Sequence, residues 1–224
     1  GAPSRKISFT VPTGNFGDIF AGYAAKRMGL PVSKLVIATN ENDILARTLR
    51  TGRYEMKGVT ATTSPSMDIQ ISSNFERLLF EASGRDSASV RAAMGQMRQS
   101  GGFDLEETTL KAIKKEFSAG RASEKQVKAK IAEIAGQTGY VVDPHTAVAM
   151  HVAAKAEKAN APMVALSTAH PAKFPEAVKS ASGIDPALPP CLTDLMQREE
   201  RFQVLPAAQG KVEAHILAKA RAVR

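Results

Sequence analysis

The sequence PTGNFGD, Pro12–Asp18, decides the fold that we predict for this chain. A β-rich run, Ile7–Val11, precedes it, and a helical pattern over Ile19–Met28 follows. A strand, a glycine turn and a helix in this order leave backbone N–H groups at the start of the helix without partners, which makes an anion site. Gly14 and Gly17 allow positive φ angles and a close approach of the backbone to a ligand, which a Cβ would block.

The same string also fits a plain turn in which Asn15 or Asp18 only caps the helix. The string lacks the pattern G-x-G-x-x-G and the Lys-Ser/Thr pair of a nucleotide P-loop, so a dinucleotide or ATP is disfavoured. If the turn binds an anion, a compact phosphate is the ligand that we expect.

Length and composition indicate a globular protein. The chain has 224 residues, of which 43% are apolar, and this is enough for a substantial core. Hydrophobic runs stay short of the roughly 20 residues that span a bilayer, so we expect no membrane partner. No charged-then-apolar leader opens the chain, and we predict a cytoplasmic location. The single cysteine, Cys191, excludes an internal disulfide and offers no zinc site.

The net charge of +8 suits an anionic ligand or a nucleic acid. However, the basic residues are spread over helical faces with acidic residues between them, and the chain has no tryptophan. No RNP-like or zinc-finger pattern is present. We therefore expect no nucleic-acid partner and no metal site.

Alternating strands and helices predict an α/β fold with a parallel sheet flanked by helices. We expect further buried strands at Lys34–Thr39 and Met163–Ser167, the second of them central in the sheet. Ligands bind beyond the carboxyl ends of such strands, where both PTGNFGD and the polar residues Thr168–Pro171 lie. The stretch Gly58–Ser73 between them reads as a loop, and a helix is expected to follow it.

We predict three charged, amphipathic helices at 89–99, 105–118 and 123–135, which together indicate an inserted helical subdomain. The expected organisation is an α/β phosphate-binding part at 1–86, the helical insertion at 87–140, and an α/β part at 141–224. The last part would complete the sheet and carry the C-terminal helices.

Four strings then coincide: PTGNFGD at Pro12, SSNFERLLF at Ser72, DPHTAVA at Asp143 and STAHPAKF at Ser167. Together they closely resemble the carboxyl-terminal part of threonine synthase, in the longer form found in many bacteria and fungi. That family has the pyridoxal-phosphate fold type II of the tryptophan synthase β subunit. Its members convert O-phospho-L-homoserine and water to L-threonine and phosphate, so the resemblance implies the same cofactor and substrate here.

The resemblance also implies a cofactor site. The cup for the 5′-phosphate of pyridoxal phosphate would consist of Gly14, Asn15, Phe16, Gly17 and Asp18, with the backbone of Asp18 rather than its carboxylate near the phosphate. Thr168 matches the hydroxyl residue that bonds the pyridine nitrogen. A neutral hydroxyl at this place leaves the ring nitrogen largely unprotonated and moderates the electron sink.

Several motif residues keep two interpretations. His145, His170 and Lys173 either touch the ligand or play structural roles. The motif Ser72–Arg77 has no role that the residues alone reveal. A cap at Ser73 or Asn74, together with a buried Arg77 paired with an acid such as Glu76, explains it without chemistry.

The family's Schiff-base lysine and its substrate-gripping loop lie in the amino-terminal half, and this sequence contains neither. We therefore expect a piece of a longer enzyme, with no catalytic lysine of its own, that needs the amino-terminal half as a partner and is inactive alone. Two alternatives remain. One is a related pyridoxal-phosphate lyase or synthase for another amino acid, and the other is a non-catalytic module that binds a phosphometabolite.

Overall fold

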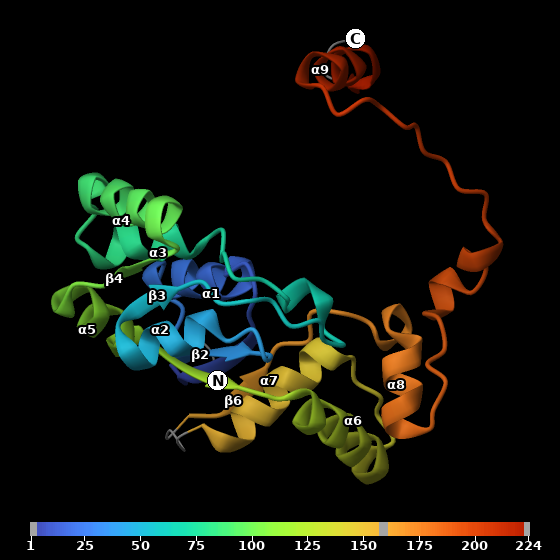
Figure 1. Cartoon of the computed structure of the whole chain (residues 1–224). Helices are drawn as coiled ribbons and strands as arrows, with labels where there is room; N and C mark the ends of the chain where they lie inside the picture. The colour runs from blue at the N-terminus through green and yellow to red at the C-terminus, as the bar shows by residue number, and fades with distance from the viewer. Residues whose placement is uncertain (1–3, 157–160, 222–224) are drawn as a thin grey trace. The chain divides into compact units, whose positions relative to one another are not determined.

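The computed structural model describes residues 4–156 and 161–221 (Figure 1). The chain divides into two compact units, Gly1–Ala187 and Leu188–Arg224. The first unit contains the sheets. The second contains two 3₁₀ turns and the helix α9, with bounds Pro190–Leu192, Leu195–Gln197 and Gln209–Lys219. In the described ranges, no helix is long and apolar enough to cross a bilayer.

The main sheet has four parallel strands in the order β5-β2-β1-β6, which confirms the predicted parallel sheet. Their bounds are β1 Ile7–Pro12, β2 Val32–Thr39, β5 Phe117–Arg121 and β6 Met163–Ala165. The chain leaves β1 through helix α1 to reach β2 on one side, whereas β6 pairs with β1 on the other side. The carboxyl ends of β1 and β6 therefore flank the point where the strand order reverses, which is where ligands bind in open α/β sheets.

Helices cover both faces of this sheet (Figure 1). Alternate residues of β2 show this, because successive side chains of a strand point to opposite faces. Leu35 and Ile37 join the apolar core that contains the buried face of α1, Gly17–Arg27. Val36 belongs to a second core, together with the buried small residues of α7, Pro144–Lys155.

The remaining elements surround these two layers. The strands β3 and β4 form a separate antiparallel pair. The bounds are α2 Ile44–Thr51, β3 Arg53–Glu55, a 3₁₀ turn Pro65–Met67, α3 Phe75–Ala82, α4 Ser87–Ser100, β4 Gly102–Asp104, α5 Glu107–Glu116, α6 Glu124–Thr138, a 3₁₀ turn Pro171–Lys173 and α8 Pro175–Ser182.

The segment 87–140 is not wholly helical, which corrects the prediction of a helical insertion. It contains α4, α5 and α6 close to the expected positions, but it also contributes β5 to the edge of the main sheet. The expected helix ends early because Phe117 is buried against the rings of Phe16 and Tyr23. The division at 1–86, 87–140 and 141–224 stays a prediction about functional parts.

Strand β6 lies at the edge of the sheet, whereas the sequence predicted a central, buried strand. It covers three residues, pairs with no strand other than β1 among the residues that the structure describes, and exposes 40% of its middle residue Val164. Its apolar composition therefore does not reflect burial in the sheet that the structure describes.

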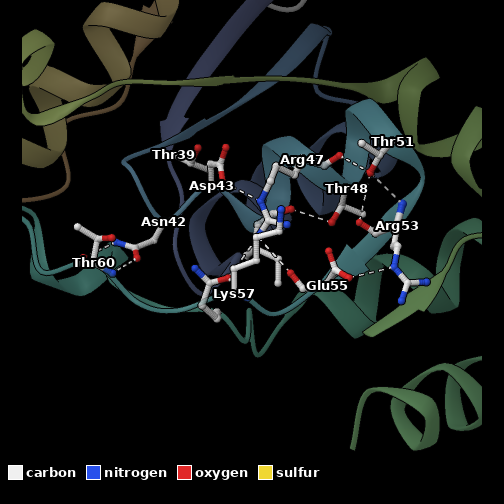
Figure 2. A network of polar contacts seen from close by, with 12 residues as sticks. Thr39, Asn42, Asp43, Arg47, Thr48, Thr51, Arg53, Glu55, Lys57 and Thr60 are labelled. Carbon is white, nitrogen blue, oxygen red and sulfur yellow. Dashed lines mark hydrogen bonds and ion pairs between the residues drawn. The ribbon is translucent and has the colours of Figure 1, made fainter. Parts of the chain in front are cut away.

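A buried arginine ties α2 to the following segments. The Nε of Arg47 donates to the Oδ1 of Asp43 at 2.8 Å, and an Nη of the same side chain donates to the carbonyl oxygen of Glu55 at 3.1 Å (Figure 2). The same nitrogen also donates to the Oε1 of Gln70 at 3.3 Å. Arg47 is 9% exposed, so these bonds are largely shielded from water.

We expect Arg47→Ala to lower the free energy of unfolding by about 2–4 kcal/mol, since it leaves the Asp43 carboxylate shielded and unpaired. Urea denaturation of the chain measures this change. Arg53→Ala is the matched control, because Arg53 pairs with Asp104 and Glu55 at the surface, where ion pairs contribute little. Equal losses from the two substitutions would contradict the prediction.

Candidate functional site

A cavity of about 290 Å³ lies at the carboxyl ends of β1 and β6. Every residue predicted as a site residue lines it, namely Gly14, Asn15, Phe16, Gly17, Asp18 and Thr168. The rest of the lining consists of Pro12, Thr13, Ile19, Ser66, Met67, His145, Ala169, Lys173 and Phe174. The fold therefore brings the glycine turn and the distant threonine to one space of a size that suits a small ligand.

The backbone N–H groups at the start of α1 are open. The cap residue is Phe16, in the left-handed conformation with φ 65°, and no side chain caps the helix. The alternative in which Asn15 or Asp18 caps the helix is therefore wrong. Among the described residues, no oxygen accepts a hydrogen bond from the N–H groups of residues 15–18. Such groups, together with the helix dipole, attract an anion.

Neither glycine of the turn uses the positive φ angles that glycine allows, so the absence of a Cβ matters there for space. At Gly14 an added Cβ would lie 2.7 Å from the carbonyl oxygen of Ser66 and 3.1 Å from the Cα of Met67, so Gly14 allows two backbone segments to pack together. At Gly17 an added Cβ would have no protein atom within 4 Å. Gly17 therefore leaves space beside the open N–H groups, as a site for a phosphate group requires.

Within the turn, Phe16 adopts the left-handed conformation, which costs energy for a residue with a Cβ. Its side chain is 1% exposed and meets the rings of Phe75 and Phe117 at centroid distances of 5.5 and 5.8 Å. This aromatic packing holds the turn in place.

Residues of the motif at Ser72 donate hydrogen bonds to two carbonyl oxygens of the glycine turn. The Oγ of Ser72 donates to the carbonyl oxygen of Gly14 at 2.7 Å. The backbone N–H and the side-chain Nδ2 of Asn74 both donate to the carbonyl oxygen of Asn15, at 3.0 and 2.9 Å. Asn74 is the cap residue of α3, but its side chain does not cap that helix.

Arg77 is exposed, so the interpretation in which it is buried and paired with an acid such as Glu76 is wrong. Its guanidinium carbon lies 4.1 Å from the ring centroid of Phe20, which is a cation–π contact. Arg77 lines a separate hollow of about 660 Å³ beside α1, α3 and α4 and does not line the cavity at β1 and β6.

The loop between Gly58 and Ser73 supplies Ser66 and Met67, two lining residues that the sequence reading missed. Asp68 anchors this loop, because its carboxylate accepts bonds from the Nδ2 atoms of Asn40 and Asn42 at 2.7 and 2.9 Å. It also accepts from the hydroxyl and the backbone N–H of the loop residue Thr62, at 2.6 and 2.8 Å. No local sequence signal identifies this wall, since it depends on contacts between distant residues. Asp68 therefore has a structural role, because its hydrogen bonds hold this loop against Asn40 and Asn42.

Asp143 binds residues at the start of α7, one of which, His145, lines the cavity. Asp143 is 1% exposed and caps α7, where it accepts from the backbone N–H groups of His145 and Thr146 at 2.8 and 3.3 Å. Its Oδ2 also accepts a hydrogen bond from the Thr146 hydroxyl, which lies 3.2 Å from the Oγ of Ser167. The network therefore connects the start of α7 to the segment that carries Thr168.

His145 is buried, and its Nδ1 lies 3.1 Å from the Oδ1 of Asp143. A carboxylate only accepts hydrogen bonds, so this contact assigns a proton to Nδ1. The Nε2 atom has no partner among the described residues. Burial raises the pKa of Asp143, but the hydrogen bonds from His145 and Thr146 outweigh it and hold that pKa below its ordinary value.

The segment after β6 contributes Thr168 and Lys173. Thr168 is exposed, and no hydrogen bond of its hydroxyl is formed within the described ranges, so the hydroxyl is available to a ligand. Lys173 is also exposed and lines the cavity. His170 does not line the cavity; its Nδ1 accepts from the N–H of Ala172 at 3.2 Å and caps the short 3₁₀ turn. Among the described residues, no cluster of His, Cys, Asp or Glu suits a metal ion.

Comparisons with known proteins agree with this geometry. The family model "Threonine synthase, C-terminal" matches residues 146–216. A threonine synthase from Pseudomonas aeruginosa is 48% identical over 96% of this chain and 46% of its own length. The crystal structure of a threonine synthase from Brucella melitensis with bound pyridoxal phosphate is 60% identical over 99% of this chain and 48% of its own, with a TM-score of 0.91. The yeast enzyme is 38% identical over 100% of this chain and 49% of its own, with a TM-score of 0.82.

The similarity to these threonine synthases covers nearly all of this chain, whereas the chain spans about half the length of the relatives it matches. The matching family model is itself that of the carboxyl-terminal region. The chain is therefore homologous to the carboxyl-terminal half of threonine synthases.

Proposed function

We propose that this chain is the cofactor-phosphate-binding part of a threonine synthase that uses pyridoxal phosphate. The whole protein would convert O-phospho-L-homoserine and water to L-threonine and phosphate. An amino-terminal half would supply the lysine that holds the cofactor and the loop that grips the substrate, so this chain alone would be inactive. The PLP-bound relative from Brucella melitensis and the doubled length of the relatives support this proposal.

One observation carries the proposal: residues 14–18 and Thr168 line the same cavity. The open N–H groups at the start of α1 would bind the 5′-phosphate, and the space beside Gly17 admits it. The residues present therefore fit the cofactor, because open N–H groups and a free hydroxyl line the same cavity. The exposed Lys173 adds a positive charge to the lining.

When bound, pyridoxal phosphate supplies an electron sink for carbanions of an amino-acid substrate. The residues of this chain would orient it. Thr168 offers a neutral hydroxyl that would donate a hydrogen bond to the ring nitrogen and keep its own proton. The carboxylate of Asp18 would repel a phosphate, so the backbone N–H of this residue is the group that we assign to binding.

A titration of the chain with inorganic phosphate and with pyridoxal phosphate, followed by NMR, tests the cup. We expect the amide signals of residues 15–18 to shift in both titrations. Signals that stay in place would contradict the proposal. The intact parent protein, assayed with phosphohomoserine, serine and threonine in parallel, tests the substrate. Turnover of serine or threonine alone would favour a different pyridoxal-phosphate enzyme, and no turnover of any of them would favour a binding module.

Gly17→Ala is expected to weaken binding of phosphate at least about tenfold while it leaves the free energy of unfolding within about 0.5 kcal/mol of the original value. The reason is that the new methyl group meets no protein atom and would occupy space that the ligand needs. The same NMR titration measures affinity, and urea denaturation measures stability. Gly136→Ala, in helix α6 and also without a neighbour near the new Cβ, is the control and should bind phosphate as before.

A further inference from the structure

The hydrogen bonds between the motif at Ser72 and the glycine turn end on two consecutive carbonyl oxygens. The Gly14 oxygen accepts from Ser72, and the Asn15 oxygen accepts twice from Asn74. Neither Ser72 nor Asn74 lines the cavity, so these three bonds hold the turn through residues outside the cavity lining. These bonds therefore fix the direction of two carbonyl groups of the turn.

Because peptide units are planar, holding these carbonyl groups also sets the direction of the N–H groups in the same peptide units. In a planar trans peptide unit, the C=O of one residue and the N–H of the next point in opposite directions. A Gly14 carbonyl held by Ser72 directs the N–H of Asn15 the other way. An Asn15 carbonyl held by Asn74 does the same for the N–H of Phe16. Both N–H groups lack a protein acceptor in the described part of the chain, and both residues line the cavity.

We propose that Ser72 and Asn74 are positioning residues of the anion cup, which set two peptide units so that the N–H groups of Asn15 and Phe16 face a bound phosphate group. The inference rests on the proposed function, since it assumes that the cup binds a phosphate. It assigns a role to Ser72 and Asn74, two of the three polar residues of the SSN string, whose role the resemblance alone leaves open.

The alternative to positioning is simple anchoring of helix α3. Anchoring would affect stability only, whereas positioning affects the energy of a bound anion. If a peptide unit turns over, a carbonyl oxygen replaces an N–H beside the phosphate, and the contact becomes repulsive. Loss of the hydrogen bonds from Ser72 or from Asn74 therefore lowers the affinity of the folded protein for the anion, even where most molecules remain folded.

The test uses the 224-residue chain and inorganic phosphate as the probe, with pyridoxal phosphate as a second probe. The variants are Ser72→Ala and Asn74→Ala. NMR titration gives the affinity from the amide shifts of residues 15–18, and urea denaturation gives the stability. Ser83→Ala is the matched control, because its hydroxyl also donates to a backbone carbonyl, that of Phe80, at the other end of α3.

We expect Ser72→Ala to weaken phosphate binding about three- to tenfold, because one well-formed hydrogen bond is lost. Asn74→Ala should weaken it about two- to fivefold, since the backbone N–H of residue 74 still holds the Asn15 carbonyl. In both variants the ligand-free amide signals of Asn15 and Phe16 should move and broaden. Ser83→Ala should match the unsubstituted chain in affinity and in these signals.

Equal affinity in the unsubstituted chain and in both variants would overturn this inference and leave the proposed function standing. If the unsubstituted chain itself shows no shifts with phosphate, the proposed function falls and the inference falls with it. If Ser72→Ala does not fold, Asn74→Ala decides the inference alone, since the Asn74 side chain is partly exposed and tolerates truncation.

Discussion

Asp143→Ala is expected to lower the free energy of unfolding by about 3 kcal/mol. The substitution removes a buried N-cap and leaves two backbone N–H groups, the Thr146 hydroxyl and His145 Nδ1 without their acceptor. A lost cap costs about 1 kcal/mol, and each buried donor that loses its partner adds to this. Urea or thermal denaturation of the 224-residue chain measures the loss.

Asp86→Ala is the control for this prediction. Asp86 also caps a helix, α4, and accepts from the N–H of Ala88 at 2.8 Å, but its side chain is exposed. Water replaces its lost bonds, so we expect a clearly smaller effect than at Asp143. A loss at Asp86 as large as that at Asp143 would show that burial is not the reason for the effect.

The pKa of Asp143 predicts how this contribution depends on pH. Burial raises that pKa, but hydrogen bonds from His145 and Thr146 lower it by more, so the folded-state pKa lies below the ordinary value of 3.8. The folded protein then binds fewer protons than the unfolded chain, and stability rises with pH in this range. The contribution is present above about pH 4 and is lost as pH falls through the folded pKa.

Asp143→Asn keeps one acceptor oxygen and removes the titration. We expect it to be less destabilising than alanine at neutral pH and to flatten the loss of stability below about pH 4. Denaturation midpoints between pH 2.5 and pH 7, by roughly half-unit steps around the ordinary aspartate pKa, measure both effects. Parallel pH curves for the two proteins would assign the acid sensitivity to other carboxylates.

Gly14→Ala is expected to reduce phosphate affinity by more than about tenfold and to lower the free energy of unfolding by about 1–3 kcal/mol. The new Cβ would lie 2.7 Å from the Ser66 carbonyl oxygen and 3.1 Å from the Met67 Cα, both backbone atoms that cannot rotate away. Either the turn or the loop at Ser66 must move, and both line the cavity. NMR titration and urea denaturation measure the two effects.

Gly14→Ala and Gly17→Ala therefore distinguish a clash of the new methyl group with the protein from a clash with the ligand. At Gly14 affinity and stability should fall together, because the added atom meets protein. At Gly17 affinity should fall while stability stays, because the added atom meets no protein atom within 4 Å and would compete with the ligand for space. If Gly14→Ala retains both stability and affinity, the close approach of the loop to the turn does not matter for the cup.

The sequence was sufficient for the features that depend on local order. The strand, the glycine turn and the helix at Ile7–Met28 follow each other along the chain, and hydrophobic patterns over short windows indicate them. The parallel sheet also followed from the alternation of strands and helices. Open N–H groups at the start of α1 were predicted on the same basis, because the first turn of any helix has them.

Long-range packing decided the features that the sequence reading missed or misplaced. Strand β5 joined the sheet instead of extending a helix because Phe117 packs on Phe16 and Tyr23, which precede it by about a hundred positions. The positive φ angle fell on Phe16 rather than on a glycine, since its ring is held by Phe75. Such contacts leave no periodic signal in any short window of sequence.

The sequence by itself determined that a glycine turn precedes a helix at the carboxyl end of a parallel strand, and it indicated Thr168 through a resemblance. Only the tertiary structure decided that the two share a cavity, that Ser66 and Met67 line it, and that Ser72 and Asn74 bond to the carbonyl oxygens of the turn. The physical reason is that hydrogen bonds within one turn depend on neighbouring residues, whereas the shape of a cavity depends on how distant segments pack.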